Sequence, residues 1–167
     1  MELARRPGAN VVAILEERAG TSFIQCLAAA AHANPSLSMA VIDYLGSEDP
    51  VLTSVLCDRI TYSRRRAGAA RIAELAELVF QRIESDDYSS PPHLLVITGL
   101  KAMRDIDQIP DQGEPISNLL QKIASDGPEV GVHLILIDDS IRSFERRIDR
   151  GLLGEFGIRI VGQMSAN

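Results

Sequence analysis

The sequence predicts a three-layer α/β fold, in which a mainly parallel sheet lies between helices on both faces. First, the chain contains continuous apolar runs of strand length, which are typical of strands buried on both sides. These runs are residues 10–15, 39–43, 93–97, 132–137 and 158–161, with a weaker candidate at 59–62. Second, helical patterns separate most of the runs, an alternation that indicates right-handed β-α-β units. Third, a length of 167 residues suits a single domain, 1–167, with a sizeable core.

The segments between the strands predict the helices. The clearest is 67–83, where apolar residues recur at helical spacing and form one stripe. The first helix is expected at 23–33, after a turn at 16–20, with Thr21 or Ser22 as its cap. Two more helices are expected at 116–124 and 143–153, and an exposed loop at 106–115, which contains two prolines and a glycine.

Composition excludes several classes of protein. The chain is 46% apolar and 24% charged, which is ordinary for a globular domain and unlike a disordered or collagen-like chain. Its two cysteines, Cys26 and Cys57, are too few and too far apart for a disulfide scaffold or a zinc site. Since the sequence contains no run of 18 apolar residues and no secretory signal, we expect a cytoplasmic protein without a membrane span.

The charge balance argues against a free-standing nucleic-acid-binding protein, which is usually basic as a whole. The net charge is −6, and the basic residues are 15 arginines and two lysines. Arginines gather at 64–66 and at 142–150, where they would contact phosphates, a partner protein or only solvent. A contact with DNA would therefore have to come from one of these local patches.

Ligands of such folds bind at the carboxyl ends of the strands. The first of these ends has the position of a phosphate-binding loop, which has the pattern Gly, four residues, Gly, Lys and then Ser or Thr. When the chain is aligned on Gly20 and Ser22, Leu15 stands for the first glycine and Thr21 for the lysine. These residues fit either an altered phosphate-binding loop or an ordinary turn from strand to helix.

The charges of this segment count against a polyanionic ligand. Glu16 and Glu17 would face the phosphates. Two like charges about 4 Å apart cost about 4 kcal/mol at an effective dielectric of about 20. Arg18 would offset part of this repulsion, although an arginine is not a positional substitute for the missing lysine.

Two further strand ends contain polar residues. Thr98 follows the central strand, and its hydroxyl can form a hydrogen bond but cannot act as a general base. Asp138 and Asp139 form the most acidic strand end and, with Ser140, suit the start of a helix. An aspartate pair of the receiver type would instead follow the first strand, and a metal-adhesion motif would need a serine in place of Arg142.

The remaining candidate residues favour structural roles. His32, His93 and His133 do not cluster with other ligands at metal-binding spacing. The sequence contains no Gly-x-Ser-x-Gly motif, so a hydrolase triad has no support. From these motifs we expect no metal site and no catalytic residue.

Five parts of the chain share their order and spacing with a known family. They are 8–14, 22–35 with 39–44, 94–100, 131–136 and 156–161. The sequence of 131–136, Gly-Val-His-Leu-Ile-Leu, is the closest match, similar to Gly-Ile-His-Leu-Ile-Leu in that family. The chain thereby resembles the FtsK/SpoIIIE branch of RecA-like motor ATPases, which includes HerA-type translocases and the multi-ATPase subunits of type VII secretion. This resemblance covers nearly the whole chain and implies a RecA-like P-loop NTPase core.

The resemblance also identifies the positions that depart from the family. Thr21 replaces the phosphate-loop lysine, and Thr98 and Gly99 replace the metal-binding aspartate and the catalytic glutamate. Asp138 and Asp139 replace the Thr-Gln sensor pair. What this implies is a degenerate ATPase module without catalytic or metal-binding residues. The positions expected to keep contacts with a nucleotide are Arg18, Gly20, Thr21, Ser22, Thr98, Asp138 and Asp139.

The family further implies a domain taken from a longer protein, since the sequence stops directly after a core strand where the family continues. Such a domain would be structural or regulatory beside neighbouring ATPase domains or subunits, and not an enzyme in isolation. Two alternatives stay open. One is an active domain that binds ATP with Mg²⁺, in which Arg18 replaces the lysine and Asp138 or Asp139 holds the metal. The other is a DNA-contacting module that uses Arg64–Arg66.

Overall fold

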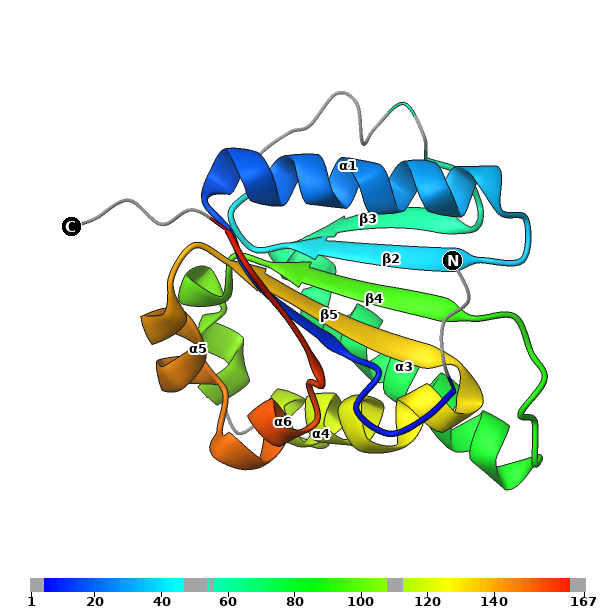
Figure 1. Cartoon of the computed structure of the whole chain (residues 1–167). Coiled ribbons are helices and arrows are strands. Elements are labelled where there is room, and N and C mark those ends of the chain that lie inside the picture. The colour runs from blue at the N-terminus through cyan, green and yellow to red at the C-terminus, as the bar shows by residue number, and fades with distance from the viewer. Residues whose placement is uncertain (1–4, 47–53, 55, 108–112, 163–167) are drawn as a thin grey trace.

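The structure, a computed structural model, describes residues 5–46, 54, 56–107 and 113–162. A six-stranded sheet forms its centre, with the strand order β3-β2-β4-β5-β1-β6 and parallel pairing between all neighbours (Figure 1). The strands are β1 (Val11–Ile14), β2 (Ser38–Asp43), β3 (Ile60–Arg64), β4 (His93–Thr98), β5 (Val132–Asp138) and β6 (Ile158–Val161). The predicted α/β fold with a parallel sheet is therefore confirmed.

Helices cover both faces of the sheet, as Figure 1 shows. α1 (Glu17–Ala33) lies on one face. The opposite face is covered by α3 (Arg65–Glu84), α4 (Ile116–Asp126), α5 (Ile141–Arg147) and α6 (Arg150–Gly154), joined by the 3₁₀ helices η1 (Leu100–Ala102), η2 (Arg104–Asp107) and η3 (Gly127–Val130). The buried apolar residues accordingly form two clusters, one on each side of the sheet. Among the described residues, no helix is both long enough and apolar enough to cross a membrane.

The strands at the centre of the sheet are buried on both faces, as their continuous apolar runs predict. Every residue of β5 is buried, and β4 is buried from Leu94 to Ile97. Leucine and β-branched side chains suit such strands because they pack well against the pleated surface. β6 lies at the edge of the sheet, and its Ile158 and Val161 are exposed.

The start of the first helix was predicted wrongly. α1 begins at Glu17 instead of residue 23, and the turn expected at 16–20 is not formed. The backbone N–H of Gly20 donates to the Glu16 carbonyl at 2.8 Å, which is a helical hydrogen bond. Thr21 and Ser22 therefore lie within the helix and do not cap it. The reason lies in packing, because the buried stripe of the helix extends back to Gly20. The buried residues of α1 are Gly20, Ile24, Leu27, Ala28 and Ala31.

The helix predicted at 143–153 is in fact two short helices, α5 and α6. Between them Ile148 has an extended backbone, with φ −117° and ψ 123°, and its side chain is only 3% exposed. The Asp149 side chain then caps α6 by accepting a hydrogen bond from the Leu152 N–H at 2.8 Å. Burial of Ile148 and this new cap outweigh the continuous helical pattern. Of the loop predicted at 106–115, residues 108–112 lie outside the described ones, and η2 occupies its first two positions.

A single buried asparagine ties the first strand to three other segments. Asn10 has no exposed surface, and its Nδ2 donates to the carbonyls of Ala124 at 2.8 Å and Glu155 at 3.0 Å. Its Oδ1 accepts from the backbone N–H of Leu134 at 2.9 Å. One side chain thus satisfies polar backbone groups of α4, of the end of α6 and of β5.

Two histidines near the amino ends of the central strands have a buried nitrogen without a hydrogen-bond partner. In the described part of the chain, neither Nε2 of His93 nor Nε2 of His133 has a partner. Nδ1 of His133 lies 3.0 Å from the Ala9 carbonyl, to which it donates when it holds the ring proton. Burial lowers the pKa of both rings, to about 4 for His93, so that both are neutral near pH 7. This supports the structural roles expected from the sequence.

Candidate functional site

The ends of four strands meet at one edge of the sheet. In the register, Asp43 of β2 lies beside Thr98 of β4, and Ile14 of β1 lies beside Asp138 of β5. β4 and β5 are also neighbours, with Thr98 beside Ile137. The strand order therefore brings together polar residues that are far apart in the sequence.

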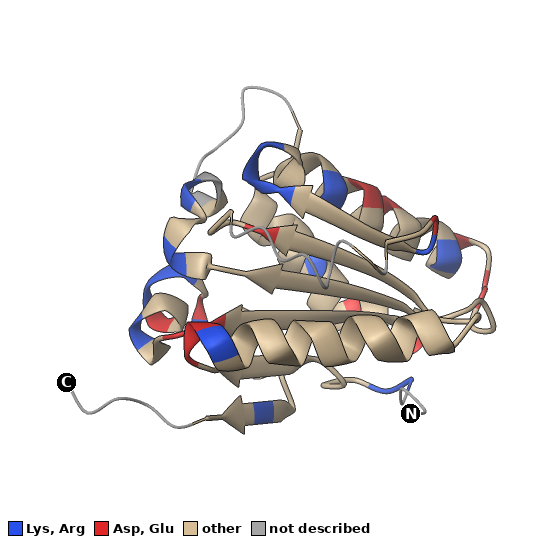
Figure 2. Cartoon of the chain, turned by 90° about the horizontal axis from the view of Figure 1, so that it is seen from above, with Lys and Arg blue, Asp and Glu red and all other residues tan. Residues whose placement is uncertain are grey.

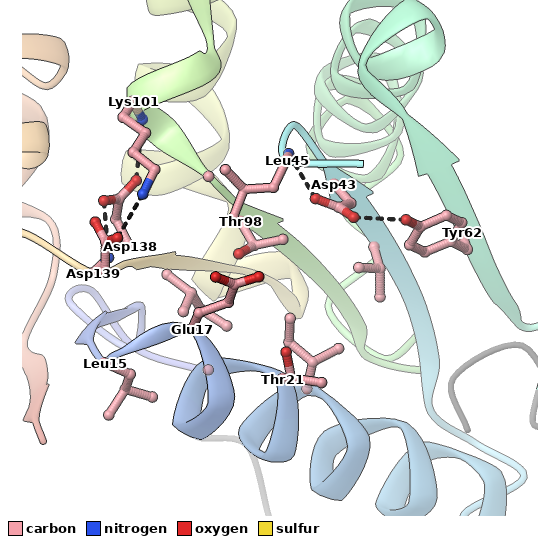
Figure 3. A pocket seen from close by; sticks show the side chains of 15 residues that line it. Leu15, Glu17, Thr21, Asp43, Leu45, Tyr62, Thr98, Lys101, Asp138 and Asp139 are labelled. Atoms are coloured by element: carbon pink, nitrogen blue, oxygen red, sulfur yellow. Dashed lines mark hydrogen bonds and ion pairs between the residues drawn. The ribbon is translucent and has the colours of Figure 1, made fainter. Parts of the chain in front are cut away.

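A pocket of about 590 Å³, including its open mouth, lies at this edge and beside the start of α1 (Figure 3). Its apolar lining is Leu15, Ile24, Val41, Leu45 and Ile137. Its other lining residues are Glu17, Gly20, Thr21, Asp43, Tyr62, Thr98, Gly99, Lys101, Asp138 and Asp139. With four carboxyl groups and one amino group, the lining has a formal charge of −3.

Most of the residues predicted from the sequence line this pocket, but two do not. Those that do are Gly20, Thr21, Thr98, Asp138 and Asp139. Arg18 and Ser22 are exposed on α1 and are not part of the lining. Helical spacing explains the difference, because Glu17, Thr21 and Ile24 share one face of α1, from which residues 18 and 22 are rotated away.

Sequence reasoning missed four polar residues of the pocket, namely Glu17, Asp43, Tyr62 and Lys101. Glu17 was considered only as a residue that repels phosphate. A signal existed for Asp43, because it ends an apolar run of strand length, where a ligand site is expected. Tyr62 lies in the weakest strand candidate, and only the pairing of β3 with β2 brings it to Asp43.

Asp43 is held in place by hydrogen bonds at the end of β2. It is buried, and its Oδ1 accepts from the backbone N–H groups of Leu45 at 2.8 Å and Gly46 at 3.0 Å. Its Oδ2 accepts from the Tyr62 hydroxyl at 2.7 Å. Burial, together with this hydrogen bond, raises the pKa of Tyr62, so the hydroxyl stays protonated and remains a donor. The carboxyl group of Asp43 is therefore already satisfied by the protein itself.

The lysine of the pocket is also engaged. Lys101 Nζ lies 2.5 Å from Asp139 Oδ2, and its backbone N–H donates to Asp138 Oδ2 at 3.1 Å. The bond to Asp139 raises the pKa of Lys101 and lowers that of Asp139, so this pair stays charged. Asp138 is 4% exposed, and burial raises its pKa. The ammonium group of Lys101 is thus directed to these two aspartates, as Figure 3 shows.

A helix follows Asp138 and Asp139 as predicted, with Ser140 as its cap, although it ends at Arg147 instead of extending to residue 153. The Ser140 hydroxyl accepts a hydrogen bond from the Arg142 N–H at 3.2 Å, and α5 begins at Ile141. Asp139 is exposed and faces Lys101 instead of the helix end. The interpretation of this segment as a helix start therefore accounts for Ser140, whereas both aspartates belong to the pocket wall.

These residues do not fit ATP with Mg²⁺. The phosphate-binding loop is missing, because only Leu15 and Glu16 separate β1 from α1 and the next backbone N–H groups belong to a helix. Among the described residues, no group of three His, Cys, Asp or Glu side chains could hold a metal ion. The acidic lining would repel a triphosphate, and the lysine at its rim is paired with Asp139.

Comparison with known proteins gives the fold a clear relationship. No protein-family model matches the chain, and no curated protein matches it either. Among solved structures, EccC of Thermomonospora curvata (ATPases 2 and 3, in complex with a signal sequence peptide) superposes with a TM-score of 0.73 at 14% identity. The match covers 99% of this chain and 33% of that chain.

Two other solved ATPases show the same relationship. EssC of Geobacillus thermodenitrificans (ATPases 2 and 3) superposes with a TM-score of 0.62 at 16% identity. That match covers 94% of this chain and 32% of the EssC chain. The pCW3 conjugation coupling protein TcpA, solved as a monomer with ATPγS, superposes with a TM-score of 0.68 at 12% identity. That match covers 94% of this chain and 49% of the TcpA chain. The chain thus spans between a third and a half of these proteins, and it has the fold of FtsK/SpoIIIE-type ATPase domains that its sequence predicts.

Proposed function

We propose that this chain is a non-hydrolysing ATPase-type domain with a structural or regulatory role in a larger, cytoplasmic translocase. The observation that supports this most directly is the two-residue link between β1 and α1. A phosphate-binding loop needs several non-helical residues whose N–H groups surround the phosphates. Here Glu17 to Gly20 are helical instead, and the carboxylate of Glu17 is part of the pocket lining.

The partners of the domain would be neighbouring ATPase domains or subunits. EccC and EssC were solved with ATPases 2 and 3 together, so each of those proteins contains several such domains. The chain matches about a third of either two-ATPase structure, which is less than the half that one of two equal domains would occupy. A domain that keeps the fold but lacks the phosphate loop can still pack against active copies.

Titration calorimetry with ATP and Mg²⁺ tests the proposal. We expect no heat of binding up to about 1 mM nucleotide, which corresponds to a binding free energy weaker than about −4 kcal/mol. We also expect no ATP turnover by the purified chain, with circular dichroism verifying that the sample is folded. Micromolar binding would contradict the proposal, as would steady turnover that is lost when Ser22 is replaced by alanine.

A second candidate function, contact with DNA, is favoured by the arginines at the start of α3. The first turn of α3 contains Arg65 and Arg66, no acidic residue and no side-chain cap, although a positive charge is unfavourable at that end of a helix. Figure 2 shows lysine and arginine gathered at the end of the sheet where the strands finish, together with aspartate and glutamate. An anionic partner at this end of α3 would relieve the unfavourable placement of these exposed charges.

Binding of duplex DNA at low salt would distinguish this second function. If DNA is the partner, affinity should fall steeply with salt, with a slope of about −0.9 for each phosphate contacted. The double variant Arg65→Ala with Arg66→Ala should then reduce that slope by about two. The variant Arg159→Ala on β6 is the matched control. If the unmodified chain does not bind at low salt, DNA contact is excluded.

A further inference from the structure

We propose that the pocket binds an organic cation, a guanidinium or alkylammonium group, with its charged head between Glu17, Thr21 and Thr98. The inference rests on the proposed function, in which the pocket does not hold a nucleotide. Three features of the pocket support it: acceptors without partners, a lining with a net negative charge, and several aliphatic side chains in the lining.

Three polar groups in the pocket have no hydrogen-bond partner within the part of the chain that the structure describes. They are the Glu17 carboxylate and the hydroxyls of Thr21 and Thr98, and Figure 3 shows Glu17 directed into the space between the two threonines. An ionised carboxylate can only accept hydrogen bonds, and a hydroxyl can accept as well as donate. A ligand with several N–H donors can satisfy all three groups together. A guanidinium offers five such bonds and an ammonium three.

The negative charges of the pocket outnumber its positive charge, since Lys101 is the single cation among the described residues of the lining and Glu17 is the weakest of the three carboxylates that act on it. The Nζ of Lys101 lies 2.5 Å from Asp139 and is directed to that side chain. Glu17 is exposed at the start of α1, a helix end that opposes a positive charge, but its attraction for a cation exceeds that in bulk water because the effective dielectric near a protein surface is about 20 instead of about 80. It would also make charge-assisted hydrogen bonds, which are roughly twice as strong as neutral ones.

The apolar part of the lining suits the stem of such a cation. Leu15, Ile24, Val41 and Ile137 line it with aliphatic carbon. Arginine and lysine stems, and aliphatic amines, bury their methylene groups on such surfaces while the charged head stays among polar groups. An inorganic ion would make no use of this wall, and the described residues offer no cluster of three metal ligands.

The same chemistry has two sources. One is an arginine or lysine side chain of a neighbouring domain, which would make the pocket a docking point in the assembly. The other is a free aliphatic amine. Both present an alkyl stem with a multivalent donor, and the experiment below separates them.

Titration of the ¹⁵N-labelled chain with agmatine, an alkylguanidinium, tests the inference by nuclear magnetic resonance. We expect the amide signals of Gly20, Thr98 and Gly99 to shift, with a millimolar or tighter dissociation constant that weakens as salt is added. The variants Glu17→Gln and Thr98→Val should each weaken binding, the former by about tenfold. Glu129→Gln removes the same charge from an exposed side chain of η3, outside the pocket, and should leave binding unchanged.

A short arginine peptide and its citrulline counterpart separate the two sources. Tighter binding of the arginine peptide than of agmatine supports a protein side chain, and the reverse order supports a free amine. The absence of shifts at millimolar agmatine overturns the inference, as does equal binding by the Glu17→Gln variant. If neither agmatine nor ATP binds, only this inference fails. If ATP binds and shifts the same amides, the proposed function fails as well.

Discussion

Replacement of Asn10 by leucine is expected to lower the free energy of unfolding by about 3 kcal/mol or more. The leucine would leave the Leu134 N–H and the carbonyls of Ala124 and Glu155 without their hydrogen-bond partner. A buried polar group without a partner costs about 1–3 kcal/mol, and three such groups are affected together. Urea unfolding followed by circular dichroism measures the loss directly.

The matched control is Asn118→Leu, because Asn118 is exposed on α4 and no hydrogen bond of its side chain links distant segments. That substitution should change stability by no more than about 0.5 kcal/mol, as is usual for exposed positions. A loss below about 1 kcal/mol for Asn10→Leu would mean that the three backbone groups find other partners or water.

Acidification is expected to destabilise the fold through His93. Burial, with smaller contributions from Arg82 and Arg71, lowers the pKa of His93 to about 4, from 6.5. Below pH 6.5 the unfolded chain therefore binds more protons than the folded one. The stability contributed by the neutral ring is present above pH 6.5, falls as the pH drops, and is lost near pH 4. At 1.36 kcal/mol for each pH unit, the complete loss is about 3 kcal/mol.

Urea unfolding near pH 7.5 and near pH 5 measures this effect, with an expected difference of about 2 kcal/mol from His93 alone. Burial lowers the pKa of His133 as well, which acts in the same direction. The variant His93→Gln should lose the contribution of His93 to the pH dependence of stability, even if its stability at pH 7.5 differs from that of the unmodified chain. The matched control is His32→Gln, because His32 is exposed on α1, and this variant should keep the full pH dependence. An unchanged pH dependence in His93→Gln would show that the neutral form of His93 is not what the fold requires.

Much of the fold could be predicted because the sheet is buried on both faces. A continuous apolar run of strand length, such as 132–137, has few alternatives in a chain of this composition. The ends of the helices were harder to predict. Gly20 belongs to the buried stripe of α1, but a glycine before two hydroxyl residues also suits a turn with a cap. At Ile148, burial of one side chain interrupts a helical pattern that the sequence alone presents as continuous.

The candidate site was only partly predictable for a related reason. Strand ends locate a site along the chain, and Thr98, Asp138 and Asp139 were found in this way. Which strand ends are neighbours depends on the strand order, and that order brings Tyr62 and Asp43 into the same pocket. The direction of a side chain from α1 depends in turn on where the helix begins, so Arg18 was predicted in place of Glu17.

The short link between β1 and α1 also limits how such a domain can change in evolution. Substitutions alone cannot turn Leu15 and Glu16 into a loop that surrounds a phosphate, because the chain between strand and helix is too short. A loop of that length would require an insertion, or unwinding of the first turn of α1 with exposure of the buried stripe that begins at Gly20. Single substitutions at Leu15 or Glu16 therefore alter packing and surface charge at this strand end but leave the length of the link unchanged.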